Sequence, residues 1–301
     1  MIDKLEMFIA LAREQHFGRA AESLNISQPT LSAGIKQLEE VLGTQLVFRG
    51  SRFGGLTPEG QSALAWARKI VADTRQMRDE MRAKRHGLAG EIRLAVIPTA
   101  LTWAANLSSE FSKAHPRVRF TILSRTSREI LAMLENFEVD AGISYLDNEP
   151  LGRVDTLPIY REDYMAVCGT SHALARRERA GWADLDGIPL ALLTPDMQNR
   201  RIVNQRIAEA GATAGTCIES NSIVVLIASA LAGECVAILP TDMARFLATG
   251  RDLALLPLDT DGSGHSVGLI LPQRDPRTPV LEALNVKAAQ LARAGRPPLT
   301  V

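Results

Sequence analysis

The stretch ISQPTLSAGIKQLE, residues 26–39, combines the start signals of a helix with a face of short polar side chains. Ser27 is placed to cap the helix, because a serine hydroxyl can accept a hydrogen bond from a free N–H of the first turn. Pro29 is tolerated there, since that turn lacks N–H partners in any case. The apolar residues at helical spacing predict the side that packs on the domain: Leu31, Ile35, Leu38 and Leu42.

The flanking residues predict a winged helix-turn-helix. Helical patterns precede the stretch at residues 5–12 and 20–24, and Gly43 follows it. Two short strands are predicted at residues 45–49 and 56–57, around a glycine-rich loop. Such a unit places the N-terminal part of its last helix in the major groove of DNA.

The polar face of this helix has the chemistry to read bases. Gln28, Thr30 and Ser32 offer short donors and acceptors for base edges, and Lys36 can reach a phosphate. Two wing residues could add backbone or minor-groove contacts: Arg49 and Arg52. The alternative is that the three short residues are only solvated residues at a helix start.

A long helix is predicted next. Thr57-Pro58-Glu59 combines an N-cap, a proline at the first helical position and an acid near the positive end of the dipole, and the pattern runs to about Arg85. One apolar seam follows this helix: Leu64, Val71, Thr74, Met77 and Met81. A single stripe on a long helix favours pairing with the same helix of a second chain. The alternative is that the stripe packs on the chain's own globular body.

A second domain is predicted after the glycine-rich hinge at residues 87–90. Residues 92–144 follow a β-α-β-α-β order, which predicts a parallel, doubly wound sheet with ligands at the carboxyl ends of its strands. Further strands and helices up to residue 292 are enough for two lobes with a cleft between them.

Composition bounds the class of protein. The 301 residues are 46% apolar and 23% charged, with zero formal net charge, which is typical of a globular protein. The start of the chain resembles no secretory signal, and no run reaches the ~18 apolar residues of a membrane span, so the sequence predicts a cytoplasmic protein. The chain has an odd number of cysteines, Cys168, Cys217 and Cys235, which favours three buried thiols. The alternative is that Cys217 and Cys235 form a redox-sensing pair.

Several stretches resemble the LysR-type transcriptional regulators: FGRAAESLNISQPTLS at 17–32, LTPEG at 56–60, VDAGI at 139–143 and AGECVAILP at 232–240. The resemblance implies an α/β protein with an N-terminal α+β winged helix-turn-helix in residues 1–58 and a dimerising linker helix in 59–87. It implies an effector-binding regulatory domain in 91–301, built like a two-lobed periplasmic binding protein. Lobe I would comprise 91–161 and 267–301, and lobe II 162–266.

The same resemblance assigns sites and partners. Its DNA-facing positions fall on the helix start and the wing: Ser27, Gln28, Pro29, Thr30, Ser32, Lys36, Arg49 and Arg52. Its effector positions fall on four segments: Pro98, Thr99, Ala100, Leu101, Ser127, Ile143, Ser144, Gln198, Asn199 and Arg200. The implied partners are double-stranded promoter DNA, a small effector and further copies of the chain as a homodimer and homotetramer, with RNA polymerase as an additional candidate.

The effector is predicted to be a carboxylate or another small anion. Thr99 and Ser127 each stand at the start of a predicted helix, where free N–H groups attract negative charge, and Arg200 could add charge-assisted bonds. The alternative is that both hydroxyls only cap their helices. The wing sequence RFGGLT at 52–57 also resembles regulators of formate dehydrogenase operons, which would suit a very small anion.

Three residues depart from the family's usual pattern. Gly34 stands inside the DNA-reading helix, where it would remove a side chain from the DNA face. Phe137 occupies a turn where glycine is usual, and Cys235 replaces a glycine, so it could narrow the cleft or supply a reactive thiol.

The sequence disfavours two other classes of function. An enzyme on a two-lobed α/β scaffold is disfavoured because the chain has no phosphate loop, dinucleotide fingerprint, nucleophile elbow or zinc helix. The sequence therefore predicts no catalytic residue, metal ligand or cofactor. A free-standing solute-binding protein is disfavoured by the DNA-reading motif and the missing export signal.

Overall fold

A computed structural model describes residues 1–48, 53–147, 151–233, 235–260, 264–273 and 277–295. The chain forms two compact units. The first comprises Met1–Leu88 together with Glu135–Glu138, and the second comprises Ala89–Leu134 and Val139–Val301. No described helix is both long enough and apolar enough to span a membrane.

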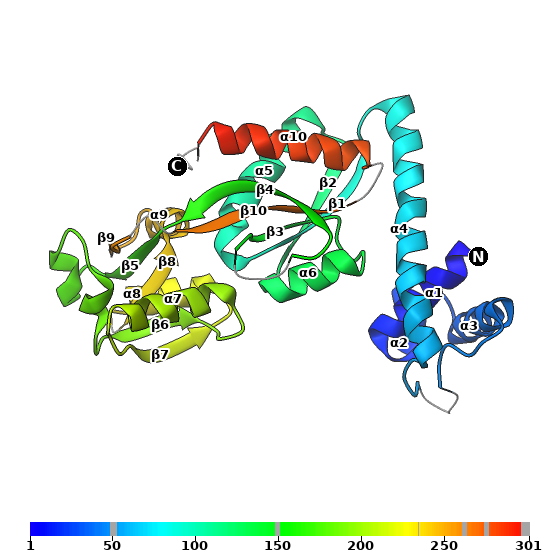
Figure 1. Ribbon diagram of the computed structural model, residues 1–301, viewed down its shortest axis with the longest axis horizontal. Helices are drawn as coiled ribbons and strands as arrows, with labels where there is room; N and C mark the ends of the chain where they lie inside the picture. Colours follow the sequence, from blue (N-terminus) through cyan, green and yellow to red (C-terminus); the bar gives the residue numbers. More distant parts are fainter. Residues whose placement is uncertain (49–52, 148–150, 234, 261–263, 274–276, 296–301) are drawn as a thin grey trace. The chain divides into compact units, whose positions relative to one another are not determined.

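The first unit packs three short helices against one end of a long one (Figure 1). Its helices are α1 (Ile2–Glu14), α2 (Phe17–Ser23), α3 (Gln28–Leu42) and α4 (Pro58–His86). Fully buried side chains from these helices and from the segment after α3 form the core: Phe8, Leu11, Leu31, Leu38 and Leu46.

Local signals set both ends of α3. The Ser27 hydroxyl accepts a hydrogen bond from the N–H of Thr30 at 3.2 Å, as its capping position predicts. Gly43 ends the helix in the left-handed region, with φ of 69°. Leu42 was expected in the core but is 47% exposed, because it lies in the last turn of the helix, outside the buried cluster.

The wing is held by an antiparallel bridge between Val47 and Leu56 rather than by two regular strands. The N–H of Phe48 donates to the carbonyl of Gly55, and the N–H of Thr57 donates to that of Leu46, each at 3.1 Å. The two wing arginines predicted to touch DNA, Arg49 and Arg52, lie outside the described residues.

The apolar side chains of α4 divide between two faces. Leu64 and Val71 pack on the core of the first unit, with Ala67 buried between them, so the alternative of packing on the chain's own body holds for this part of the predicted seam. A different set of large apolar side chains on α4 is exposed: Trp66, Ile70, Met77 and Met81. We call this set the α4 stripe.

The second unit contains two five-stranded sheets, which we call lobe I and lobe II. Lobe I has the strand order β2-β1-β3-β10-β4, with β1 (Gly90–Val96), β2 (Val118–Ser124), β3 (Ala141–Tyr145), β4 (Val154–Glu162) and β10 (His265–Pro272). Lobe II has the order β7-β6-β8-β5-β9, with β5 (Tyr164–Gly169), β6 (Pro189–Leu193), β7 (Gly215–Ser220), β8 (Val236–Pro240) and β9 (Leu253–Pro257).

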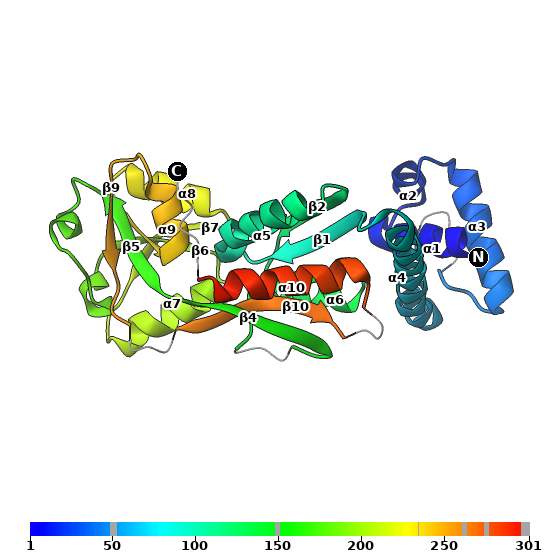
Figure 2. The ribbon, with the colours of Figure 1, turned by 90° about the horizontal axis from the view of Figure 1, so that it is seen from above.

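Helices cover both sheets, as Figures 1 and 2 show. Lobe I carries α5 (Leu101–Ala114), preceded by the 3-10 turn η1 (Pro98–Ala100), α6 (Ser127–Glu135) and α10 (Pro279–Arg293). Lobe II carries α7 (Gln198–Glu209), α8 (Ile223–Leu231) and α9 (Thr241–Ala248), together with the 3-10 turns η2 (Ala173–Arg176) and η3 (Trp182–Leu185). The predicted two-lobed α/β architecture is therefore correct.

The parallel pairing predicted for residues 92–144 is correct, because β1 runs parallel to both β2 and β3. The later strands add antiparallel pairs. In lobe I, β10 runs antiparallel to both β3 and β4, and in lobe II, β5 runs antiparallel to both β8 and β9. The cause is the connection between the lobes. The chain leaves lobe I after β4, builds lobe II from β5 to β9, and returns to lobe I as β10.

Candidate functional site

The start of α3 presents its polar side chains to solvent. Gln28, Pro29, Thr30, Ser32 and Lys36 are exposed, whereas Leu31 and Ile35 between them are buried. Ser27 is also exposed, but its hydroxyl is already engaged with Thr30. The helix therefore presents the side chains that the sequence analysis assigned to DNA.

Gly34 does not lie on this exposed face, so the prediction that it removes a side chain from the DNA face is wrong. It is buried in the contact between α3 and α1, where a Cβ atom would lie 2.3 Å from the sulfur of Met7. The missing side chain allows the two helices to approach closely.

In the second unit, the predicted effector residues partly gather around a small cavity of about 10 Å³ between the lobes. Such a volume has room for about one water molecule. Five of the predicted residues line it together with Ile97, Tyr145, Leu193 and Met197: Pro98, Thr99, Ser127, Gln198 and Asn199.

Three polar atoms of this lining are buried without a hydrogen-bond partner: Thr99 Oγ1, Ser127 Oγ and Gln198 Oε1. The Gln198 side-chain amide donates through Nε2 to the carbonyl of Asp147 at 3.1 Å, so its free oxygen can only accept. A buried polar group without a partner costs about 1–3 kcal/mol. Several such groups around one cavity indicate a place for a polar ligand or for water.

Neither Thr99 nor Ser127 caps a helix, which removes the alternative that both hydroxyls serve only as caps. Thr126 caps α6 instead: its hydroxyl accepts from the N–H of Glu129 at 3.2 Å, and the Glu129 carboxylate accepts from the N–H of Thr126 at 2.8 Å. Helix α5 begins at Ala100 without any side-chain cap. The hydroxyls of Thr99 and Ser127 are thus available to a ligand.

Arg200 does not line the cavity, and its predicted role in binding an anion is corrected. Its Nη1 donates to the carbonyl of Leu193 at 2.8 Å and to Glu219 at 2.7 Å, and its Nε donates to Asn204 at 2.8 Å. These hydrogen bonds use the donors of the buried guanidinium within the protein and connect α7 to β6 and β7.

The other predicted effector residues have different surroundings. Ala100 and Ile143 are fully buried and line neither this cavity nor the larger one described below. Ser144 is buried with a hydroxyl that has no partner. Leu101 lines the larger cavity.

A buried carboxylate, missed by the sequence analysis, joins the two lobes beside the small cavity. Glu162, at the end of β4, accepts a hydrogen bond from Tyr145 of lobe I at 2.5 Å and from Tyr164 of lobe II at 2.9 Å. Asn199 donates to the same group of oxygens at 3.4 Å. Burial raises the pKa of Glu162, and burial together with this carboxylate raises the pKa of both tyrosines well above the usual value.

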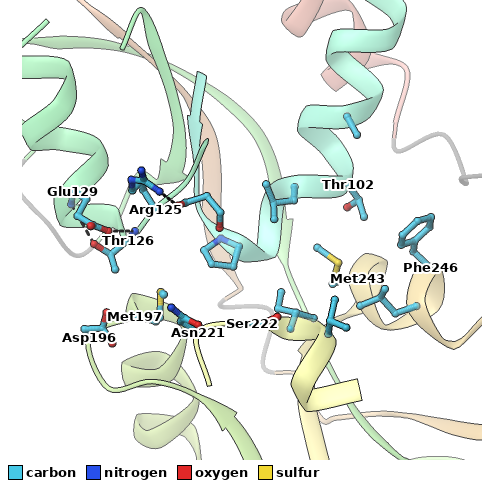
Figure 3. A pocket seen from close by; sticks show the side chains of 17 residues that line it. Thr102, Arg125, Thr126, Glu129, Asp196, Met197, Asn221, Ser222, Met243 and Phe246 are labelled. Atoms are coloured by element: carbon cyan, nitrogen blue, oxygen red, sulfur yellow. Dashed lines mark hydrogen bonds between the residues drawn. The ribbon is translucent and has the colours of Figure 1, made fainter. Parts of the chain in front are cut away.

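A larger cavity of about 690 Å³ opens between the lobes and shares Pro98 and Met197 with the small one (Figure 3). We call it the interlobe cleft. Segments of both lobes line it: Pro98, Leu101, Thr102, Ala105, Ser124, Arg125, Thr126, Glu129, Asp196, Met197, Asn221, Ser222, Ile223, Val224, Met243, Phe246 and Leu247.

The cysteines are not placed for a disulfide. Leu190 of β6 is paired on one side with Thr216 of β7 and on the other with Val236 of β8, so Cys217 and Cys235 are separated by an intervening strand. Two strand spacings amount to about 10 Å, beyond the ~7 Å that a disulfide can span between Cα atoms. Among the described residues, no group of three histidine, cysteine or acidic side chains is placed to hold a metal ion.

A helix-turn-helix unit with an exposed polar helix, joined to a two-lobed α/β domain with a cavity between its lobes, defines a DNA-binding regulator with an effector domain. The sequence matches family models for both parts. Residues 2–61 match the bacterial regulatory helix-turn-helix protein, lysR family, and residues 85–285 match the LysR substrate binding domain. The chain belongs to the LysR family of transcriptional regulators, which are not enzymes.

Individual relatives agree with this assignment. The chain is 32% identical to the SDS degradation transcriptional activation protein of a Pseudomonas species over 264 residues, which is 85% of this chain and 84% of the relative. It is 27% identical to the hydrogen peroxide-inducible genes activator of Dickeya chrysanthemi over 241 residues, 80% and 79% of the two chains. A full-length OxyR variant from Pseudomonas aeruginosa has a similar structure, with a TM-score of 0.73, 26% identity and coverage of 96% and 94%.

Proposed function

We propose that this LysR-type regulator reads promoter DNA with the start of α3 and responds to a small anionic effector bound between its lobes. The observation that carries the proposal is the exposed polar face of a capped α3. The proposed DNA contacts are Ser27, Gln28, Pro29, Thr30, Ser32 and Lys36, with Arg49 and Arg52 of the wing.

The exposed polar side chains of α3 have different proposed roles. Gln28, Thr30 and Ser32 are short enough to hydrogen-bond base edges in the major groove. Lys36 contacts a phosphate, for which it is free to leave its 3.9 Å pairing with Glu40 on the exposed surface.

The effector site combines the small cavity with the interlobe cleft. Thr99, Ser127 and Gln198 supply buried polar atoms that have no protein partner. The starts of η1 and α6 add backbone N–H groups, which favour an anion. Arg125, rather than Arg200, is the cation among the residues that line the cleft. The wing resembles regulators of formate dehydrogenase operons, and the very small anion that this resemblance suggests stays a prediction.

The α4 stripe supports a homodimer. Four exposed apolar side chains on one long helix favour burial against the same helix of a second copy. Two such dimers as a homotetramer would double the number of reading helices on one promoter, which raises affinity without a net positive charge. RNA polymerase is the further partner that such a regulator would contact on the promoter.

A redox response through Cys217 and Cys235 is the weaker proposal. Its support is the relative named as a hydrogen peroxide-inducible activator. Against it stands the strand between the two cysteines, which would have to be displaced before a disulfide could form.

Replacing one base-reading side chain tests the proposal. Gln28→Ala should weaken binding of the full chain to its promoter by about 1–3 kcal/mol, with little change on random duplex, because a base contact carries sequence information. Binding is measured at physiological salt by fluorescence anisotropy. Gln37→Ala, at an exposed glutamine in the later part of α3, serves as the matched control.

Equal loss on promoter and random DNA in the Gln28→Ala variant would contradict base readout by this residue. A wild-type chain that binds its promoter no better than random duplex would contradict the regulator itself.

A further inference from the structure

The interlobe cleft has two sides of different chemistry. Figure 3 shows Arg125, Thr126, Glu129 and Asp196 at one side and Met243 with Phe246 at the other. Further apolar side chains from α5, α8 and α9 line the cleft: Leu101, Ala105, Val224 and Leu247. A ligand that fills this space must itself be polar at one end and apolar along the rest.

The polar side suits a head group with a single negative charge. Arg125 donates one hydrogen bond, to the carbonyl of Ser124 at 2.7 Å, and a guanidinium has five N–H donors to offer. The start of α8 also lines the cleft. Its N-cap residue, Ser222, makes no side-chain cap, so the free N–H groups of Ile223 and Val224 favour an anion, whereas the N–H of Ser222 donates to Ser220. Two carboxylates, Glu129 and Asp196, lie at the same side, and that of Glu129 accepts a hydrogen bond from the N–H of Thr126. An anionic head group must therefore contact Arg125 directly, and a second negative charge is repelled.

The apolar side suits an apolar chain of several carbon atoms. The cavity of about 690 Å³ is within the range that holds drug-sized molecules, whereas the small cavity of about 10 Å³ takes little more than a water molecule. Met243 lies on this side of the cleft, and methionine side chains adapt to ligands of different shape. Formate or acetate alone would leave most of this apolar surface uncovered.

We infer that the effector is a monoanionic amphiphile, a carboxylate or similar anion on an apolar chain, with its head beside Arg125 and its apolar chain along Met243 and Phe246. The inference rests on the proposed function, because it names the class of molecule for the same effector site.

A series of carboxylates tests the inference. Unbranched carboxylates from acetate to decanoate, each below its micelle-forming concentration, are titrated into the full chain by calorimetry. The dissociation constant should fall about fourfold for each added methylene group, with one molecule bound per chain. A dissociation constant independent of chain length, or the absence of binding by every member, would overturn the inference.

Two variants of the protein test where the apolar chain of the ligand lies. Phe246→Ser removes an apolar contact at a side chain that is 43% exposed, and should weaken octanoate binding about tenfold or more. The gain in affinity for each added methylene group should also be smaller than in the wild type. Val286→Ser acts as the control, because Val286 on α10 is 48% exposed and lies outside the cleft. Octanoate affinity that is unchanged in Phe246→Ser, or equally reduced in both variants, would place the chain elsewhere and overturn the inference.

Failure of this inference can be distinguished from failure of the proposed function. Promoter binding without any carboxylate tests the regulator alone. If acetate changed promoter binding as strongly as octanoate, and Thr99→Val removed that response, a small anionic effector would stand and the amphiphile would be excluded.

Discussion

Thr99 carries a hydroxyl that is buried inside the second unit without a hydrogen-bond partner. In a well-packed protein such a group is a net cost, because the hydroxyl gives up its bonds to water and gains none. Ser127 and Gln198 carry the same cost at the same small cavity. The fold tolerates these unpaired atoms where a bound molecule would satisfy them.

Thr99→Val should remove the effector response while sparing stability. Valine keeps the shape of threonine without the buried hydroxyl, so the free energy of unfolding should stay the same or rise by about 1 kcal/mol. Effector-induced changes in promoter binding should be lost, and binding without effector should persist. Both are measured on the full chain, by urea unfolding and by fluorescence anisotropy.

Thr57→Val is the matched comparison, because the Thr57 hydroxyl is buried and fully bonded: it donates to the carbonyl of Gln45 at 2.7 Å and accepts from the N–H of Gly60 at 2.9 Å. That change should cost about 1–2 kcal/mol. A Thr99→Val variant that loses as much stability, or that retains the effector response, would contradict the role assigned to Thr99.

Thr99 and Ser127 both line the small cavity, although neither caps the helix at whose start the sequence pattern put it. Thr126 and Ser127 are adjacent and both suit a helix cap, so a linear pattern cannot decide which one caps α6 and which one is buried. Glu162 was missed because it stands in a polar run, Tyr160 to Asp163, which resembles a solvated segment. Only the meeting of two lobes buries that carboxylate.

At the scale of elements, α4 has two apolar faces, one buried and one exposed. Its buried side chains hold it to the core of the first unit, while the α4 stripe remains exposed on described residues of the same helix. The apolar pattern in the sequence mixes the two sets, so it predicted one seam. The structure separates them, since only the stripe is open to a second chain.

Met77→Glu should shift the assembly toward monomers. A carboxylate in the middle of the α4 stripe would have to be buried without a partner when two copies pair. Sedimentation velocity over a range of concentrations gives the assembly state. Arg75→Glu, at an exposed position on the opposite side of the helix, introduces the same side chain and should leave the assembly state unchanged. An unchanged assembly in Met77→Glu would exclude the stripe from the interface.

Two edge strands, β4 and β9, were not predicted from the sequence, and the pattern of β4 shows why its strand is hard to recognise. An edge strand tolerates proline and exposed polar residues, because one of its sides has no neighbouring strand. Pro158 and Arg161 in β4 therefore hide the strand pattern. The central strands β1, β3, β6 and β8 are buried and apolar, and their sequences predicted them correctly.

At the scale of the whole effector-binding part, one buried carboxylate ties the lobes together. Glu162 bonds to Tyr145 and Tyr164, which belong to different sheets. Asn199 adds a third contact from α7, and Thr99 lies close enough to this group to influence the pKa of the carboxyl. The small cavity that Thr99 lines therefore lies directly beside the contact between the lobes.

Stability should fall as this carboxyl loses its proton. Because burial raises the pKa of Glu162, the native chain keeps the proton to a higher pH than the unfolded chain does. Its contribution to stability is fully present below the ordinary glutamate pKa of about 4.3 and is lost as pH rises through the raised value. Glu162→Gln cannot titrate, so its free energy of unfolding should depend less on pH across this window.

Urea unfolding of the wild type and Glu162→Gln between pH 4 and pH 8 checks this expectation. The stability of the wild type relative to the variant should decrease with rising pH. A difference that stays constant, or that increases with pH, would contradict a raised pKa for the buried carboxyl.

The position of β10 also determines which lobe can complete its sheet first during synthesis. This strand lies between β3 and β4 in lobe I, although it comes after all of lobe II in the chain. While the ribosome is still making residues 265–272, lobe II already has every strand of its sheet, whereas lobe I has a gap in the middle of its own. The nascent chain must therefore keep the edges of β3 and β4 unpaired until its last strand emerges, and this interval is when the protein is most exposed to wrong strand pairing.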